Sequence, residues 1–241
     1  MNVSDEHNEQ PFSAMEALQA GFAVFREHAA HCVMVMGAVE LCCLLTAFTV
    51  GRNITVATQL LTQMDSVPPD TGIYAFMVVY VIVRCAAQVL VNKWLLMLND
   101  GREMTMDELL GFDMVYQVPQ ILRMMAASIV FNIYAVLGTL MLVVPGLFAT
   151  STLRFYKFLI VDKNTDAVDG LRESYELSSH DKGGLISFNV LTGAVKLLGL
   201  ACFGIGYVPA SAACGLAEAY AYRKLVRAYD ENPLAQNANL N

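Results

Sequence analysis

The sequence predicts an all-α integral membrane protein, a six-helix transmembrane bundle, and three observations lead to this fold class. Of the 241 residues, 56% are hydrophobic and only 15% are charged, whereas a soluble domain usually carries about 25% charged residues. The mean hydropathy is positive, at +0.48. The apolar residues are also gathered in blocks, and about 20 such residues let a helix cross the bilayer. Lipid offers no partner for a free backbone N–H or C=O, so each crossing segment must be helical.

The first three predicted spans, at residues 29–50, 73–98 and 124–144, are long apolar segments. The first contains Glu40 as its only acidic residue, and the third contains no charged residue. At about 1.5 Å per residue, a helix over any of these segments is longer than the hydrocarbon core, which is about 30 Å thick. Each is therefore predicted to cross the membrane completely.

The last three predicted spans, at residues 147–161, 185–205 and 207–226, are shorter or more polar. Pro145 and Gly146 form a helix break before the fourth span, because proline removes a backbone donor and glycine tolerates a tight turn. The fourth span is the weakest of the six, and a re-entrant half-helix is the alternative for it. All six spans belong to one membrane domain at residues 11–228, between polar tails at residues 1–10 and 229–241.

Basic residues indicate which side of the membrane each connection faces, because cytoplasmic loops carry an excess of lysine and arginine. With six spans, Arg52 is the only such residue on one side. The ten on the other side are Arg26, Lys93, Arg102, Arg123, Lys163, Arg172, Lys182, Arg223, Lys224 and Arg227. If residues 147–161 did not cross, the basic connection that follows them would face the wrong side, so the charge distribution favours a crossing. Both termini are therefore expected in the cytoplasm.

Three short segments, one before each odd-numbered span, resemble one another. Residues 13–22 and 166–175 match without gaps at apolar, acidic, small and aromatic positions, and residues 106–109 keep only the middle of the pattern. Ser13 and Asp166 are expected to be N-caps. We interpret the unit as an amphipathic helix in the cytoplasmic interface followed by a two-span hairpin, used three times. The alternative is a chance similarity between short helical patterns.

Three motifs follow one another in the second half of the chain. They are Pro-Gly-Leu-Phe at 145–148, Phe-Leu-Ile-Val-Asp-Lys at 158–163 and Leu-Arg-Glu-Ser-Tyr-Glu-Leu-Ser at 171–178. In this order they resemble the YciC-like bacterial inner-membrane proteins and the related glycerophosphoryl diester phosphodiesterase membrane domain. Tyr175 stands where relatives often have tryptophan, and Lys157 stands where a less polar residue is expected. The resemblance implies a multipass protein of the bacterial inner membrane, without catalytic residues, because the phosphodiesterase activity belongs to a separate domain that this chain does not contain.

Charged residues inside predicted spans are costly in lipid and often functional. Counting about 1.5 Å per residue places Glu40 and Arg84 near the middle of the bilayer, and Lys196 and Glu218 at one shared depth. Pairing within each couple would neutralise the charges and hold the hairpins together. Two further cations suggest the alternative of a polar cavity that binds an anion, and snorkelling towards water is a third interpretation. The candidate charge layer is Glu40, Arg84, Arg154, Lys157, Lys196 and Glu218.

Two further patterns concern packing and depth in the membrane. Ser211, Gly215 and Ala219 form a face of small residues on the last span, which permits close contact between helices. Trp94 and Tyr222 are expected at the cytoplasmic interface, where amphipathic rings anchor membrane proteins. These residues are therefore assigned structural roles.

No common catalytic or cofactor motif occurs in the sequence. There is no H-E-x-x-H, G-x-S-x-G, P-loop or G-x-G-x-x-G, so an enzyme, a metal site and a cofactor are not expected. His28 and His31 are expected to be a solvated pair at the interface. A net charge of −7 gives no basic footprint for nucleic acid.

We therefore expect a structural or envelope-related membrane protein, whose partners are the lipid bilayer and other membrane proteins. The alternative is a transporter or carrier that takes a small anionic solute or a lipid headgroup through the midplane charges. Stabilisation by a solute would favour the carrier, and co-purifying proteins would favour the structural role.

Overall fold

The computed structural model describes residues 12–63, 71–102, 114–141, 148, 150–179, 181–202, 204 and 206–231. All regular secondary structure in these residues is helical, which confirms the all-α class. Residues 106–109, Pro145 and Gly146, for which the sequence makes predictions, lie outside the described residues. The helices are α1 (Ala14–Glu27), α2 (Ala29–Gln63), α3 (Thr71–Asn99), α5 (Met114–Met141), α7 (Tyr156–Asp162), α8 (Ala167–Ser179), α9 (Lys182–Ala201) and α10 (Tyr207–Glu231).

Four of these helices are long and apolar enough to cross a membrane. The qualifying segments are Ala29–Phe48 in α2, Val78–Asn99 in α3, Val118–Gly138 in α5 and Lys182–Ala201 in α9. They overlap the first, second, third and fifth predicted spans. The described part of the chain is therefore that of a helical membrane protein with several candidate crossings.

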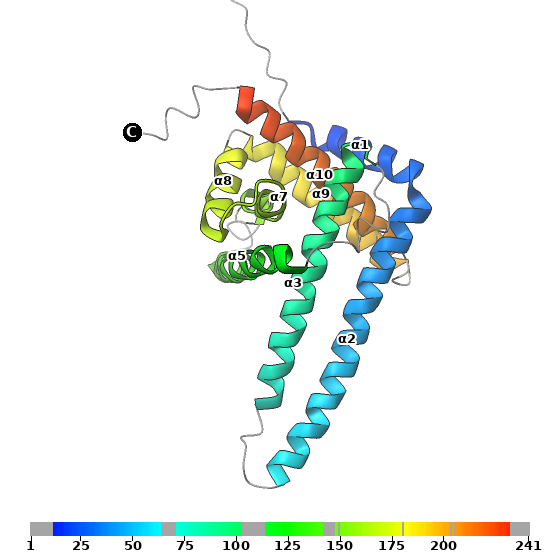
Figure 1. Cartoon of the computed structure of the whole chain (residues 1–241). Helices are drawn as coiled ribbons and strands as arrows, with labels where there is room; N and C mark the ends of the chain where they lie inside the picture. Colours follow the sequence, from blue (N-terminus) through cyan, green and yellow to red (C-terminus); the bar gives the residue numbers. More distant parts are fainter. Residues whose placement is uncertain are drawn as a thin grey trace, which may run out of the picture.

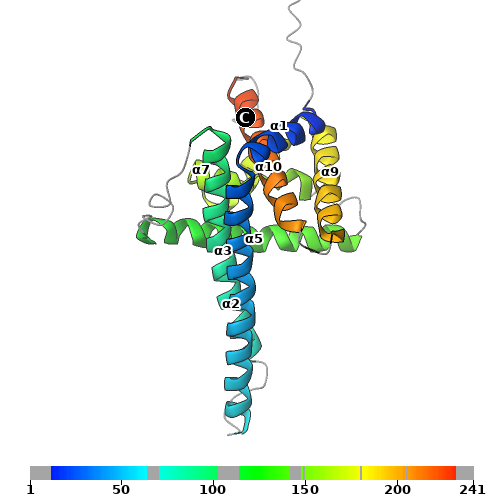
Figure 2. The same ribbon diagram turned by 90° about the vertical axis from the view of Figure 1, so that its right-hand side faces the viewer.

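The long helices do not pack as the single six-helix bundle that the sequence predicts. α2 and α3 form an antiparallel hairpin whose far half projects beyond the other helices (Figure 1). α5 lies crosswise to this hairpin instead of alongside it (Figure 2). α9 and α10 form a second hairpin, which packs against α1, and α10 also packs against α2 and α3. The described helices thus form two hairpins, with α5 set across α2 and α3.

Residues 147–161 do not form one crossing helix, which corrects the prediction for the fourth span. The described part of this segment is helical at 150–152, bends at Leu153 and turns before α7 begins. α7 has seven residues, so at about 1.5 Å per residue it is about 10 Å long, a third of the hydrocarbon core. Phe158, Leu159 and Ile160 are buried in it, against α3, α5 and α8.

α10 is as long as a membrane span, but protein encloses it. Ala212, Ala213, Cys214 and Leu216 have no exposed surface, and the helix contacts α1, α2, α3, α8 and α9. Its alanine-rich sequence suits this position, because small side chains let helices approach closely. The sixth predicted span is therefore the central helix of the fold, and it does not qualify as a membrane span by hydropathy.

The closest helix contact joins α1 to α10. A Cβ added to Gly21 would lie 2.5 Å from the backbone nitrogen of Ala217, so only glycine fits there. The predicted small-residue face of α10 is also packed. Ser211 and Ala219 are buried, and a Cβ added to Gly215 would lie 2.9 Å from Leu95 Cδ1 of α3.

α1 and α8 each precede a hairpin of long helices, as the predicted repeat requires, but their surroundings differ. The Ser13 side chain accepts a hydrogen bond from the Glu16 backbone N–H, at 3.3 Å, and so caps α1 as predicted. α1 then packs on α10 and α9, whereas α8 packs mainly on α7 and α5. Asp166, before α8, lies 2.8 Å from Arg123 Nε. α1 and α8 therefore pack against different helices, although each precedes a hairpin.

Trp94 and Tyr222, which the sequence predicts as anchors at the cytoplasmic interface, are enclosed by protein. Trp94 is 5% exposed, and Tyr222 has no exposed surface. The Tyr222 ring stacks on Phe158 with 5.4 Å between centroids, and its hydroxyl donates to Asp162 Oδ2 at 2.9 Å. A buried tyrosine is stable when its hydroxyl finds such a partner.

Candidate functional site

The predicted charge layer surrounds one cavity. The cavity has a volume of about 160 Å³ and lies between α2, α3, α7, α9 and α10. Arg154, the remaining residue of the layer, reaches the same carboxylate from outside the cavity lining. The charged residues that line the cavity are Glu40, Arg84, Lys157, Lys196 and Glu218. Residues from five helices that are far apart in the sequence therefore meet at one polar site.

Glu218 of α10 is the centre of the more enclosed half of this cavity. Its carboxylate accepts from Arg154 at 2.5 Å and from Lys196 Nζ at 3.3 Å. The Glu218 and Arg154 side chains are each 14% exposed. Arg154 also donates to Asn189 Oδ1 at 3.2 Å and to Thr192 Oγ1 at 3.3 Å. The predicted Lys196–Glu218 pair is present, and Arg154 is a second cation on the same carboxylate.

Glu40 and Arg84 form the other predicted pair, on the side of the cavity made by α2 and α3. Arg84 donates to Glu40 Oε2 at 3.3 Å. The two side chains are 38% and 28% exposed for Arg84 and Glu40, so this pair is more open than the centre at Glu218. Depth counting along the two helices thus predicts the correct partners.

Lys157 lines the cavity but takes part in none of these ion pairs. In the part of the chain that the structure describes, its ammonium has no hydrogen-bond or ion-pair partner. Four cations surround two carboxylates here, when Arg154 is counted with the lining residues. The site therefore carries an excess of two positive charges, and a buried charge without a partner is unfavourable.

Asn92 of α3 adds a second polar group that lacks a partner. Asn92 is 8% exposed, lines the same cavity, and its buried Nδ2 has no hydrogen-bond acceptor among the residues that the structure describes. Leaving a buried donor unsatisfied costs about 1–3 kcal/mol. The sequence analysis does not single out Asn92, because it selects charged residues within the spans and asparagine is uncharged.

Two serines of α8 position Arg154 and Lys157. The bend at 153–155 interrupts the helix, so backbone groups before it lose their helical partners. Ser174 Oγ and Ser178 Oγ both donate to the carbonyl oxygen of Thr152, at 3.0 and 2.8 Å. Ser174 Oγ also accepts from the backbone N–H of Phe155 at 3.1 Å. α8 thereby stabilises the bend next to which Arg154 contacts Glu218 and Lys157 lines the cavity.

These serines belong to the third sequence motif, at 171–178. In the sequence that motif supports a family resemblance, but it assigns no role to either serine. The signal was present, because buried serines four residues apart lie on one face of a helix. Their partner at Thr152 depends on the break before α7, which the sequence did not predict.

Comparisons of the chain with protein-family models, curated proteins and solved structures give no match. The interpretation of the site therefore depends on its geometry and charges, and the resemblance to the YciC-like proteins stays a prediction.

Proposed function

We propose that this chain is a multipass membrane protein that binds a small anionic group in the cavity around Glu218 and Lys157. The observation that carries the proposal is Lys157, an amine that lines the cavity while the nearby carboxylates are already paired, so that a bound anion would stabilise its protonated form. An anion would neutralise this excess charge. The proposal involves binding alone, with no chemical step and no cofactor.

The size and the remaining donors of the cavity suit a small oxyanion or the phosphate of a headgroup. A volume of about 160 Å³ corresponds to about five water molecules, at about 30 Å³ each. Asn92, which lines the same cavity as Lys157, offers an N–H donor that no described residue accepts. Charge-assisted hydrogen bonds of this kind are the strong ones. A carrier for a small anionic solute or lipid headgroup is the function that this arrangement supports best.

A structural or envelope-related role is the second candidate. The two ion pairs favour it, because they join α2 to α3 and α9 to α10 and would hold the hairpins without any ligand. In that case the excess charge at Lys157 would be balanced by water or lipid, and other membrane proteins would be the partners.

We propose the bacterial inner membrane as the location, with both termini in the cytoplasm. Arg102, Arg223, Lys224 and Arg227 lie together at the end of the molecule beside α1, and an excess of lysine and arginine is typical of the cytoplasmic side. The start of α1 and the end of α10 also lie at the same end of the molecule (Figure 1), as an even number of crossings requires.

The test is ligand-dependent thermal unfolding of the full chain in detergent, with sulfate, inorganic phosphate and glycerol phosphate as probes. A ligand that binds only the folded state raises the melting temperature with concentration. We expect at least one probe to stabilise the wild type and to have no such effect on Lys157→Met. Lys163→Met is the matched control, because Lys163 does not line the cavity and pairs loosely with Glu173 at 3.9 Å.

Two outcomes would overturn the carrier proposal. One is a melting temperature that none of these anions changes, and the other is equal stabilisation of wild type and Lys157→Met. Specific co-purification of another membrane protein, together with either outcome, would favour the structural role.

A further inference from the structure

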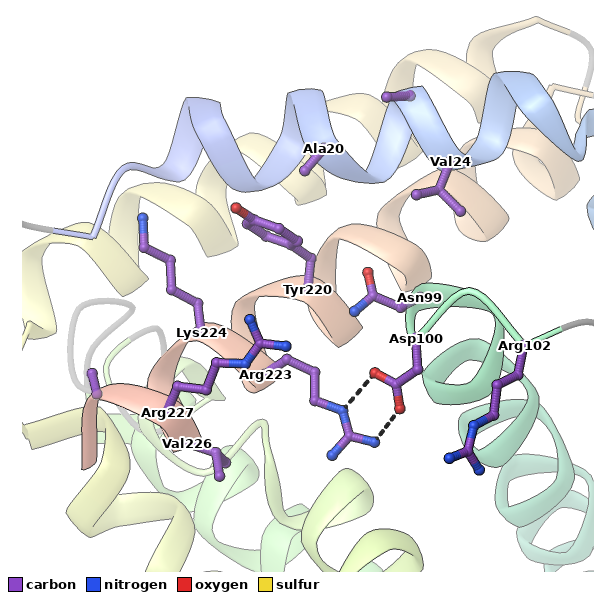
Figure 3. A pocket seen from close by; sticks show the side chains of 12 residues that line it. Ala20, Val24, Asn99, Asp100, Arg102, Tyr220, Arg223, Lys224, Val226 and Arg227 are labelled. Atoms are coloured by element: carbon purple, nitrogen blue, oxygen red, sulfur yellow. Dashed lines mark hydrogen bonds and ion pairs between the residues drawn. The ribbon is translucent and has the colours of Figure 1, made fainter. Parts of the chain in front are cut away.

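A second hollow lies at the end of the molecule where α1, the end of α3 and the last part of α10 meet. This groove has a volume of about 1110 Å³, and Figure 3 shows the side chains that line it. Ala20 and Val24 of α1 form an apolar wall, whereas α3 and α10 contribute mainly polar and basic side chains. We call it the end groove; it is separate from the cavity around Glu218, with which it shares no lining residue.

The carboxylates near the end groove already have basic partners, although Asp100 and Asp162 share the single charge of Arg223. Asp100 accepts two hydrogen bonds from Arg223, at 3.0 and 2.6 Å, and Arg223 also pairs with Asp162 at 2.8 Å. Lys224 Nζ lies 2.8 Å from Glu16 Oε2. These contacts fix the two cations to their partners, so Arg223 and Lys224 act mainly as parts of the scaffold.

Arg102 and Arg227 are the cations of the groove that remain available. Both are exposed, and neither forms an ion pair with any described residue. They lie on opposite sides of the Arg223–Asp100 pair (Figure 3). Asp100 is the only carboxylate among the lining residues, so the end groove has a net positive charge.

The depth of the end groove is that of the membrane surface. The candidate membrane span of α3 ends at Asn99, and the groove begins at that residue and continues with Asp100 and Arg102. α1 lies beside it at the same end of the molecule (Figure 2). Its side chains Met15 and Phe22 are 54% and 41% exposed, as suits a helix that lies in the interface.

We propose that the end groove binds the headgroup of an anionic phospholipid. Arg102 and Arg227 attract the anionic headgroup from the two sides of the groove, and the glycerol and first acyl carbons lie against Ala20 and Val24 of α1. A basic pocket at headgroup depth with an apolar wall fits a molecule that is anionic at one end and apolar at the other. This site goes beyond the proposed anion cavity and depends only on the placement of the chain in a membrane.

The experiment measures retention of phosphatidylglycerol and of zwitterionic phosphatidylcholine by the full chain, using native mass spectrometry from detergent. We expect the wild type to retain phosphatidylglycerol preferentially. The double variant Arg102→Gln/Arg227→Gln should bind it about 25-fold more weakly, since each basic side chain near the surface contributes about fivefold to affinity for anionic lipid.

Three controls separate the explanations. Arg172→Gln/Lys182→Gln removes two exposed charges outside the groove and should retain phosphatidylglycerol like the wild type. Lys157→Met changes the inner cavity and should also retain it, so failure of the anion-cavity proposal leaves this one standing. Melting curves show whether each variant is folded, and Arg102→Lys/Arg227→Lys should keep most of the affinity.

Equal retention of both lipids by the wild type would overturn the proposal, and so would an equal loss in the Arg172/Lys182 variant. Competition by soluble glycerol phosphate at concentrations similar to those of the lipid would also overturn it, because the site would then recognise free phosphate and not a membrane lipid.

Discussion

Glu218 and Glu40 are two carboxylates that line one cavity, each 3.3 Å from a basic side chain, yet their surroundings differ. Glu218 is 14% exposed and shared by Arg154 and Lys196. Glu40 is 28% exposed and has Arg84 alone. A carboxylate that serves two cations in an enclosed site cannot be replaced by water, whereas an open pair can exchange its partner for solvent. The two carboxylates are therefore expected to contribute unequally to stability.

Glu218→Gln should give the largest effect. It leaves Arg154 and Lys196 without their carboxylate beside Lys157, which has no partner among the described residues. Breaking a buried pair costs about 3–5 kcal/mol, so we expect a loss of that size in the free energy of unfolding in detergent. An equal loss in the free energy of unfolding for Glu218→Gln and Glu40→Gln would contradict the difference between the two carboxylates.

A double variant sharpens this result. Lys196→Met removes one of the cations that Glu218→Gln leaves uncompensated, so the double variant should lose less than the two single variants together. Additive losses would show that Lys196 and Glu218 do not interact in the folded protein.

Gly21→Val should have the next largest effect, because it displaces the helix that carries Glu218. The added side chain meets the backbone of Ala217, and overpacking of this kind costs about 1–3 kcal/mol. Movement of α10 should weaken the centre at Glu218 and leave the Glu40–Arg84 pair, which joins α2 to α3. Cysteine cross-linking between α2 and α3 that changes as much as cross-linking between α1 and α10 would contradict this division.

Glu40→Gln should cost about 1 kcal/mol, because the partly exposed Arg84 can then turn to water. The measurement is chemical denaturation in the same detergent as for Glu218→Gln. Arg84→Gln is the matched variant and should lose a similar amount. A loss close to that of Glu218→Gln would show that lipid, not water, surrounds this pair.

The smallest effect concerns Glu16, a carboxylate outside the cavity that joins α1 to α10. Hydrogen bonds from Lys224 and Tyr220 lower the pKa of Glu16 below its ordinary value of 4.5. A lowered pKa means that the contribution of Glu16 to stability is complete above pH 4.5 and is lost as the pH falls through the lowered value. The melting temperature of Glu16→Gln should therefore fall less steeply below pH 4.5 than that of the wild type. Parallel pH profiles would contradict this role.

Four candidate spans were predictable from the sequence because uninterrupted apolar runs need nothing beyond themselves to be helical in lipid. Residues 147–161 were not predictable in the same way. Their helix is interrupted at 153–155, where Ser174 and Ser178, more than twenty residues later, bind the carbonyl of Thr152. The spacing of the two serines places them on one helix face, but the sequence does not show that Thr152 is their partner.

The contacts of the candidate site that depend on the depth of a residue in the membrane were predictable from the sequence. Those that depend on which helices surround a residue were not. Counting residues along the hairpins paired Glu40 with Arg84 and Lys196 with Glu218. It missed Arg154 as a second partner of Glu218, because that contact follows from the break before α7. The sequence also predicts Trp94 as an interface anchor, because a sequence shows that a ring is amphipathic but not which helix covers it.

The length of α2 has a consequence for what the protein presents outside the bilayer. Its 35 residues extend about 52 Å, whereas the hydrocarbon core is about 30 Å thick. A helix that is about 20 Å longer than the core it would cross must tilt or extend beyond the hydrocarbon. Turns of α2 beyond the hydrocarbon lie in the aqueous layer on the side of the membrane opposite α1.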